Sequence, residues 1–310
     1  MSTRSKALLA LIVAPPILTE LASGNTSAQA FLNPRITLFL ILAYSFPLLI
    51  IRELSLRWRL STAGLFLLGL AYGIINEGFL AQTLLRFEHV PIDKFDHYLY
   101  LAGFNLSWAC VIVPWHSFFA VLFPLVLLAL WFPSCAQTTW LGKRTFALLA
   151  AILVALMAFI SFARPPHLQM LVCFLAITAL TGASFFFRNG LPTSVEPSPG
   201  RAAPFLFGLI TYPLFFLGSI ILAARRAPAE VFFLFIAVVL TGLARVCQRL
   251  GFLTAPSVAC LALGAYFSVS LFHLFAGLTH RSTSQALTGA ILCLAFLVLL
   301  SRRQPAPSSP

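Results

Sequence analysis

Apolar runs recur along the whole chain, and short polar or charged stretches separate them. Most runs are close to the ~20 residues that an α-helix needs to cross a bilayer. The strands of a membrane β-barrel are only ~10 residues long and alternate polar with apolar positions. The pattern therefore predicts an all-α, polytopic helical bundle of about ten transmembrane helices. The ten runs are Ala7–Leu21, Pro34–Ile51, Ser61–Leu85, Phe104–Trp131, Thr145–Phe162, Leu168–Phe187, Ala202–Ala223, Glu230–Leu250, Pro256–Leu278 and Ser284–Leu300.

The third run carries Asn76 and Glu77 well inside an apolar segment. A carboxylate at that depth costs a few kcal/mol (about 2.5–3.5), so it is expected to face protein or water rather than lipid. Small residues recur at four-residue spacing around it, at Gly69, Gly73 and Ala81. Residues four apart share one helix face. A Gly-xxx-Gly pair also lets a neighbouring helix approach closely. We therefore expect the face that carries Glu77 to pack against another helix.

The composition indicates one integral membrane domain covering residues 1–310. The chain is 60% hydrophobic and only 9% charged, with 31 Phe, which leaves too little polar surface to cover a soluble globule. The expected partner is the lipid bilayer, and the expected location is the cell membrane. None of the six cysteines forms a CxxC pair, so we predict small core residues and no metal site, cofactor or disulfide framework.

The net charge of +12 does not indicate nucleic-acid binding. The basic residues stand singly or in pairs at the ends of apolar runs, where they set topology, and no basic cluster is interleaved with aromatic residues. With ten spans, thirteen of the twenty Lys and Arg residues lie on the side of the termini, which predicts that both termini are cytoplasmic. The acidic loop Arg86–Gly103 is then outside. Leu191–Gly200 reads as a Pro-rich loop and Gln304–Pro310 as a disordered tail.

The N-terminal run has two readings. Arg4 and Lys6 precede it and Ala28-Gln29-Ala30 follows it, as in a cleaved signal peptide. About a dozen residues, including Glu20, separate the run from that site, which is more than a signal peptide normally has. We favour an uncleaved first helix.

Six residues are candidates for a binding site. Glu77 in the third run and His116 in the fourth lie at similar depth, toward the predicted outer side. If they touch, each stabilises the charged form of the other. Asn76 is next to the acid, and three residues in the outer parts of other runs could join the same pocket: Glu20, Asn105 and His273. The competing interpretation is a structural acid for Glu77 and interfacial positions for Glu20 and Asn105. Arg52-Glu53 is interpreted as an interfacial ion pair at the end of the second run.

Three classes of function fit these residues. Buried Glu and His together with kinking prolines (Pro47, Pro114, Pro124, Pro213) favour a small-solute or proton-coupled transporter with an outward-facing polar pocket. A Glu–His pair at one depth is also a general acid/base arrangement for an intramembrane hydrolase. The scarcity of polar residues fits a non-catalytic membrane scaffold. The chain has no P-loop, HExxH or GxSxG motif. The substrate and the oligomeric state stay open.

Residues 69–79, GLAYGIINEGF, resemble a motif written AYGI-x-EEG in an uncharacterised family of multi-spanning membrane proteins. Further similarity covers Glu20–Gly24, Ile51–Glu53, Trp108–Pro133 and Trp140–Arg144, so the resemblance extends over the first half of the chain. The family has no assigned activity. Asn76 stands where the pattern has its first glutamate, so this chain has one acid of the pair.

A looser likeness is to the intramembrane CAAX-protease and bacteriocin-processing family, which uses a Glu-Glu-xxx-Arg motif and later histidines to activate water. That resemblance would assign the acid/base roles to Glu77 and His116, with His273 as a second histidine. This chain departs from the motif at Asn76 and at Ala81, which stands in the place of the arginine.

Overall fold

The computed structural model describes residues 1–23, 25–163, 167–188, 200–279 and 283–301, and almost all regular structure in them is helical. Within these residues, eight helices are long and apolar enough to cross a membrane. They are Pro34–Trp58, Thr62–Leu80, Leu106–Trp131, Lys143–Ile160, His167–Ser184, Ala202–Ala224, Ala229–Arg249 and Pro256–Thr279. The Pro-rich loop and the C-terminal tail predicted above lie outside the described residues, apart from Gly200.

The first half of the chain alternates α-helical and π-helical segments. The elements are α1 (Thr3–Pro16), η1 (Ile17–Leu21), α2 (Ala28–Phe31), α3 (Pro34–Leu40), η2 (Ile41–Ser45), α4 (Phe46–Trp58), α5 (Thr62–Ile74), η3 (Ile75–Leu80), η4 (Thr83–Leu85), η5 (Asp93–Phe95), β1 (Tyr100–Leu101), β2 (Phe104–Asn105), α6 (Leu106–Trp115), η6 (His116–Leu122), α7 (Phe123–Trp131) and α8 (Pro133–Ala136). Segments η1, η2, η3 and η6 are π-helical, whereas η4 and η5 are single 3₁₀ turns.

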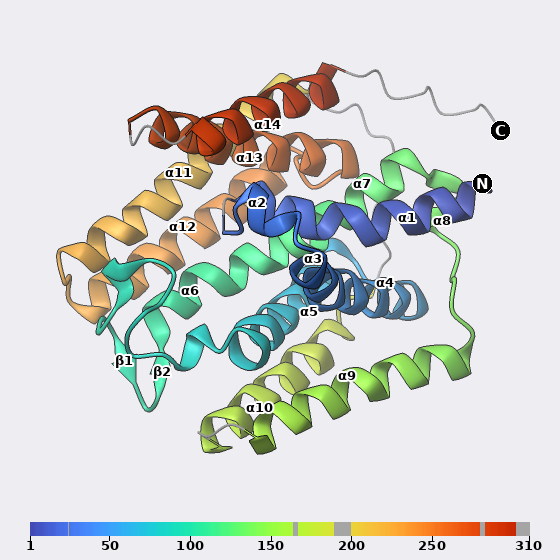
Figure 1. Ribbon diagram of the computed structural model, residues 1–310, viewed down its shortest axis with the longest axis horizontal. Coiled ribbons are helices and arrows are strands. Elements are labelled where there is room, and N and C mark those ends of the chain that lie inside the picture. The colour runs from blue at the N-terminus through green and yellow to red at the C-terminus, as the bar shows by residue number, and fades with distance from the viewer. Residues whose placement is uncertain (24, 164–166, 189–199, 280–282, 302–310) are drawn as a thin grey trace.

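The second half consists of long α-helices. They are α9 (Lys143–Ala163), α10 (His167–Ser184), α11 (Ala202–Ala224), α12 (Ala229–Arg249), α13 (Ala255–Thr279) and α14 (Thr283–Ser301). In Figure 1, α9 and α10 lie along one side of the molecule and α13 and α14 along the opposite side, with α1, α5, α6 and α7 between them. Residues of the first half thus form the centre of the bundle.

Comparison with the predicted spans shows where the pattern failed. All ten apolar runs are helical, but α1 with η1 and α14 are not among the eight spanning candidates. The helix of the second predicted run continues past Ile51 to Trp58, where α4 ends. The helix of the third predicted run ends with η3 at Leu80 rather than at Leu85. Hydropathy cannot locate these ends, because a buried charged residue such as Arg52 looks the same in sequence as an interfacial one.

Prolines explain how the central helices are joined. A proline has no N–H for the carbonyl four residues before it, and a membrane helix tolerates this when a neighbour satisfies that carbonyl. Pro16 leaves the Ile12 carbonyl free, and Ser45 Oγ donates to it at 2.6 Å. Pro47 does the same for Ala43, whose carbonyl accepts the Tyr72 hydroxyl at 3.0 Å. At the predicted kink of Pro47, and also at Pro16, the carbonyl that proline leaves without a donor thus makes a contact between helices.

The predicted stripe of small residues packs on the helix that carries His116. A Cβ added to Gly69 would come within 2.7 Å of the Ser117 Cα, and one added to Gly73 within 2.9 Å of the Val113 carbonyl oxygen. Both partners flank His116 on α6–η6. The glycines are needed because the two backbones approach too closely for a side chain. The stripe does not extend to Ala81, because η3 ends at Leu80.

The loop that follows η3 is hydrogen-bonded to the turn between α11 and α12. The Tyr98 hydroxyl donates to the Ala227 carbonyl at 2.9 Å, and Arg226 Nη1 donates to the Asp96 carbonyl at 2.7 Å. Asn105 begins α6: its Oδ1 accepts the Trp108 N–H at 3.0 Å, and its Nδ2 donates to the Phe95 carbonyl at 3.0 Å. These contacts hold the short hairpin β1–β2 over one end of the bundle (Figure 1).

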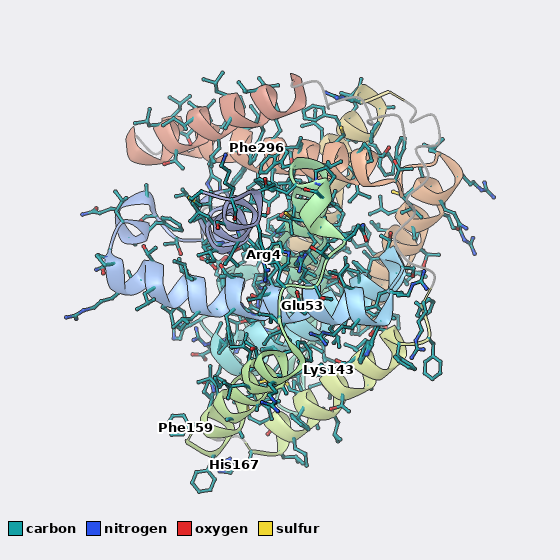
Figure 2. All side chains as sticks on the ribbon, turned by 90° about the vertical axis from the view of Figure 1, so that its right-hand side faces the viewer. Arg4, Glu53, Lys143, Phe159, His167 and Phe296 are labelled. Atoms are coloured by element: carbon teal, nitrogen blue, oxygen red, sulfur yellow. The ribbon has the colours of Figure 1, made fainter. Side chains whose placement is uncertain are left out.

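The predicted Arg52–Glu53 ion pair is present and is fully buried within the bundle. Arg52 and Glu53 are only 2% and 0% exposed and are joined at 2.7 Å. Arg52 Nη2 also donates to the Cys135 and Thr138 carbonyls at 2.7 and 2.8 Å, and its guanidinium lies 3.6 Å from the centre of the Trp140 ring. The pair therefore binds the α8–α9 connection to α4. Figure 2 shows Glu53 inside the bundle, whereas Phe159 of α9 projects from its edge.

Candidate functional site

Glu77 and His116 are in direct contact. His116 Nε2 lies 2.7 Å from Glu77 Oε1, and their side chains are 1% and 9% exposed. The acid comes from η3 and the imidazole from η6, the two segments that the close approach of α5 and α6 brings together. The similar depth of the two residues in the sequence allowed this contact without deciding it.

The second carboxylate oxygen of Glu77 is also bound. The Thr83 hydroxyl donates to Glu77 Oε2, and the Trp108 indole Nε1 donates to Thr83 Oγ1 at 2.9 Å. Thr83 follows η3 in the short turn η4, and Trp108 lies on α6. The acid is thus oriented from both sides, by an imidazole and by a hydroxyl that is itself fixed.

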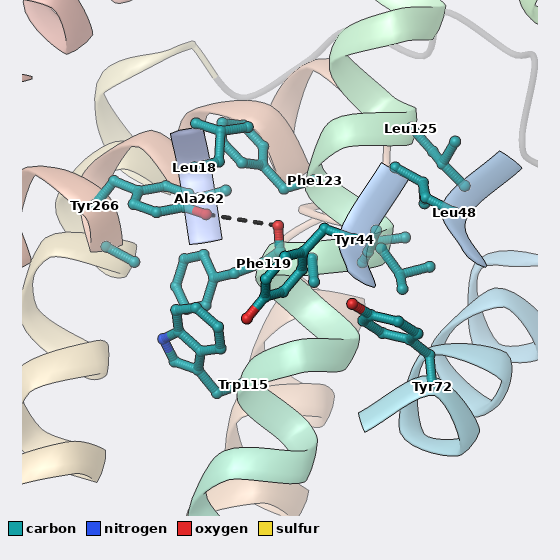
Figure 3. Packing of buried hydrophobic residues seen from close by; sticks show 14 of the residues in the cluster. Leu18, Tyr44, Leu48, Tyr72, Trp115, Phe119, Phe123, Leu125, Ala262 and Tyr266 are labelled. Atoms are coloured by element: carbon teal, nitrogen blue, oxygen red, sulfur yellow. Dashed lines mark hydrogen bonds between the residues drawn. The ribbon is translucent and has the colours of Figure 1, made fainter. Parts of the chain in front are cut away.

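Two tyrosines surround the imidazole. The rings of Tyr44 and His116 stack with centroids 6.0 Å apart, and the Tyr72 ring meets the imidazole edge-on at 5.9 Å. Asn76 Nδ2 donates to the Tyr72 hydroxyl at 3.0 Å, so Asn76 joins the site through Tyr72. Figure 3 shows Tyr44 between Trp115 and Tyr72. Trp115 packs edge-on against His116 at 5.0 Å.

Glu20 joins the site through Tyr44. The Tyr44 hydroxyl donates to Glu20 Oε1, and the Thr26 hydroxyl donates to Glu20 Oε2 at 2.6 Å. Glu20 is half-buried, whereas Tyr44 is 4% exposed. A row of protic groups therefore extends from a half-exposed carboxylate, past Tyr44, to the fully buried pair.

The four acidic, phenolic and imidazole groups of this row all lie in π-helical segments: Glu20 in η1, Tyr44 in η2, Glu77 in η3 and His116 in η6. A π-helical turn inserts an extra residue into the helical period, costs stability, and is frequently found at functional sites. Four such segments from different helices meet here. This convergence is the structural signature of the site.

His116 keeps one ring nitrogen free. Nδ1 is buried and has no hydrogen-bond partner among the residues that the structure describes. If Nε2 carries the hydrogen that faces Glu77, Nδ1 is an acceptor in the neutral ring. An imidazole with one nitrogen on a carboxylate and the other unpartnered can take up a proton at Nδ1 while Glu77 stabilises the resulting charge.

The remaining two sequence candidates are placed elsewhere. Asn105 caps α6 and touches neither Glu77 nor His116, so its role in the structure is to begin that helix. His273 Nε2 lies 2.6 Å from the Ser23 carbonyl, at the Glu20 end of the row. Within the described residues, no three His, Cys, Asp or Glu side chains are grouped so that they could hold a metal ion.

Sequence reasoning missed Tyr44, Tyr72, Thr83 and Trp108. Each lies in or beside an apolar run, where such residues are common in packing and attract no attention. A signal for Tyr72 did exist, since Pro47 leaves the Ala43 carbonyl in need of a donor from a neighbouring helix. No pattern in the chain indicates that Thr83 turns back onto Glu77.

The fold and the buried polar row define an integral, multi-pass helical membrane protein. The chain belongs to an uncharacterised membrane protein family, whose model matches residues 7–303. The match covers the second half of the chain as well as the first. Comparisons with curated proteins and with solved structures give no match.

Proposed function

We propose that this protein couples proton movement to the transport of a small solute, with Glu77 and His116 as the proton-carrying pair. The observation that carries the proposal is the 2.7 Å contact between Glu77 Oε1 and His116 Nε2, together with His116 Nδ1, which has no hydrogen-bond partner in the described part of the chain. Ionisable groups inside a membrane domain are costly and mark proton relays and substrate paths in transporters.

Glu20 and Tyr44 supply the route to this pair. The half-exposed carboxylate of Glu20 accepts the Tyr44 hydroxyl, and the Tyr44 ring covers one face of His116. A proton that enters at Glu20 reaches the imidazole by a shift of the Tyr44 side chain. The π-helical turns that carry these groups are the segments where such a shift is least opposed by regular hydrogen bonding.

An intramembrane hydrolase is the second candidate, because a carboxylate beside an imidazole can deprotonate water. The arrangement favours proton transfer over hydrolysis for one reason. Both oxygens of Glu77 already have partners, His116 and Thr83, so a water that attacks a substrate would have to displace one of them.

The test uses the full chain in proteoliposomes that contain a pH-sensitive dye, with an imposed inside-negative potential. Pools of amino acids, sugars, nucleosides and organic acids are added in turn. We expect one pool to drive acidification of the lumen, with Glu77→Gln and His116→Asn lowering that rate at least tenfold. We expect Glu20→Gln to lower it by a smaller factor, because water can reach Tyr44 when Glu20 no longer carries the proton.

The matched control is Glu88→Gln, which removes a carboxylate that is about half exposed in the loop and should leave the rate unchanged. The proposal fails if no pool drives proton movement, or if Glu77→Gln transports at the rate of the control. If the wild type cleaves a peptide or a lipid ester and Glu77→Gln does not, the hydrolase function replaces the transport proposal.

A further inference from the structure

A second site lies away from Glu77, where the helices α4 and α10 end. A hollow of about 760 Å³ is lined by Arg57, Trp58, Arg59, Phe185 and Arg188. The two chain segments are joined there by backbone contacts: Leu60 pairs with Arg188, and the Ser61 N–H donates to the Phe187 carbonyl at 2.9 Å. The three arginines are therefore held at one hollow by a fixed backbone.

The charge of this hollow is strongly positive. Among the described residues, the one carboxylate within ion-pair distance of these arginines is Glu53, which is 3.6 Å from Arg57 Nη2 and already bound to Arg52 at 2.7 Å. Arg57 also donates to the Leu141 carbonyl at 2.6 Å and lies over Phe146 of α9. Arg57 is thus engaged with its own structure, whereas Arg59 and Arg188 add two charges that no acid in the described residues balances.

Arg59 and Arg188 both have N–H groups that make no hydrogen bond within the described residues. The Arg188 guanidinium lies over the Phe185 ring, and its Nε donates to the Phe185 carbonyl at 2.9 Å. Within the described residues its two Nη groups make no hydrogen bond. Arg59 makes no side-chain hydrogen bond within the described part of the chain and is exposed. Its backbone is left-handed, with φ 52°, which ends α4 and turns the chain. Planar guanidinium groups bind phosphate oxygens with two parallel hydrogen bonds each.

The surroundings place this hollow at the edge of the membrane. It lies where the spanning candidates Pro34–Trp58 and His167–Ser184 end. Phe186 is 84% exposed beside it, and Trp58 packs edge-on against Phe185 at 5.2 Å. Aromatic side chains with nearby arginines are typical of the level of lipid headgroups.

We propose that this hollow binds a phosphate group through Arg59 and Arg188, and that the group belongs to the headgroup of an anionic phospholipid. Trp58 and Phe185 line the wall of the hollow, and the exposed Phe186, just after the end of α10, contacts the acyl chains. The site is separate from the Glu77–His116 pair and requires no transport.

The experiment compares the full-length wild type with the double variant Arg59→Asn/Arg188→Gln, because asparagine tolerates the left-handed backbone at position 59. Arg225→Gln, at an exposed position in the α11–α12 turn, is the control. Each protein is reconstituted in phosphatidylcholine nanodiscs with a minor fraction of phosphatidylglycerol and extracted in mild detergent. Lipid that stays bound is counted by native mass spectrometry, and inorganic phosphate binding is measured separately by ³¹P NMR.

We expect wild type and Arg225→Gln to retain phosphatidylglycerol in preference to phosphatidylcholine, and the double variant to lose about tenfold or more of that preference. Inorganic phosphate that binds to wild type and not to the double variant, without lipid selectivity, supports the phosphate site and assigns it to a free anion. Equal retention of lipid and equal phosphate binding in all three proteins overturns the proposal.

Discussion

Two buried carboxylates in this bundle have opposite surroundings. Glu53 is bound to Arg52, whose guanidinium also donates to backbone carbonyls of the α8–α9 connection. Glu77 is bound to His116, whose second ring nitrogen has no partner within the described residues. Arginine does not lose its proton at any accessible pH, whereas histidine does so readily.

The comparison separates a structural ion pair from a site that can change its charge. Around Glu53 the neighbours are the guanidinium groups of Arg52 and Arg57 and the Trp140 N–H of the α8–α9 connection, and none of these groups exchanges a proton easily. Around Glu77 the neighbours are an imidazole, hydroxyls and phenols, and the row continues to the half-exposed Glu20. Burial alone therefore does not mark a functional acid, and the chemistry of its partner does.

The largest effect is expected when the structural pair is broken. Glu53→Ala leaves Arg52 buried and without its carboxylate, which costs about 3–5 kcal/mol. We predict that this variant loses most of its folded yield and that its thermal unfolding midpoint in detergent falls sharply. Glu88→Ala, which truncates a carboxylate that is about half exposed, is the control. Wild-type stability in Glu53→Ala would show that the Arg52–Glu53 pair contributes little to the stability of the fold.

A smaller effect is expected at the close contact that brings the two helices together. The Cβ of Gly69→Ala would meet Ser117 at less than 3.0 Å, whereas Gly182 has no atom within 4 Å of the same position. Overpacking of this kind costs about 1–3 kcal/mol, while alanine in an open helix position stabilises by up to about 1 kcal/mol.

Equilibrium unfolding in mixed micelles should therefore show Gly69→Ala destabilised and Gly182→Ala unchanged or more stable. The same sign of change in both variants would contradict the close approach of α5 to η6. A Gly69→Ala protein that folds should also show weaker coupling between Glu77 and His116, because the helix that carries His116 is displaced.

The smallest of these effects is expected at Tyr72. Tyr72→Phe removes the donor to the Ala43 carbonyl and the acceptor of Asn76. Hydrogen bonds between membrane helices are individually weak, so we predict a loss of about 1 kcal/mol. Tyr100→Phe, whose hydroxyl makes one longer bond of 3.3 Å to the Leu85 carbonyl, should cost less. An equal loss of unfolding free energy in the two variants would show that Tyr72 does not act as a bridge between the helices.

Much of the architecture could be predicted from the sequence because apolar run length and glycine spacing act locally. The helical runs and the packing of Gly69 and Gly73 follow from such local rules. The helix ends at Trp58 and Leu80 could not be predicted in this way, because Arg52 has the same hydropathy whether it is buried or exposed. The π-helical turns depend on packing between helices, which periodicity within one helix does not record.

The candidate site was predicted in part for the same reason. Depth along a helix can be counted, so Glu77 and His116 were placed at one level. The residues that orient them, Tyr44 and Thr83, come from other elements, and the direction of their side chains is decided by tertiary contacts. Asn105 was chosen for its polarity at a helix end, where capping is the usual role of asparagine.

The most direct test of the central claim is infrared difference spectroscopy of the purified protein during a pH titration. It follows the C=O stretch of protonated carboxyl groups in wild type, Glu77→Gln, His116→Asn and Glu88→Gln. We predict a carboxyl band that is lost in Glu77→Gln, shifts in frequency in His116→Asn, and is unchanged in Glu88→Gln. A spectrum in which Glu77→Gln and His116→Asn both match wild type would contradict proton sharing by this pair and leave Glu77 as a second structural acid.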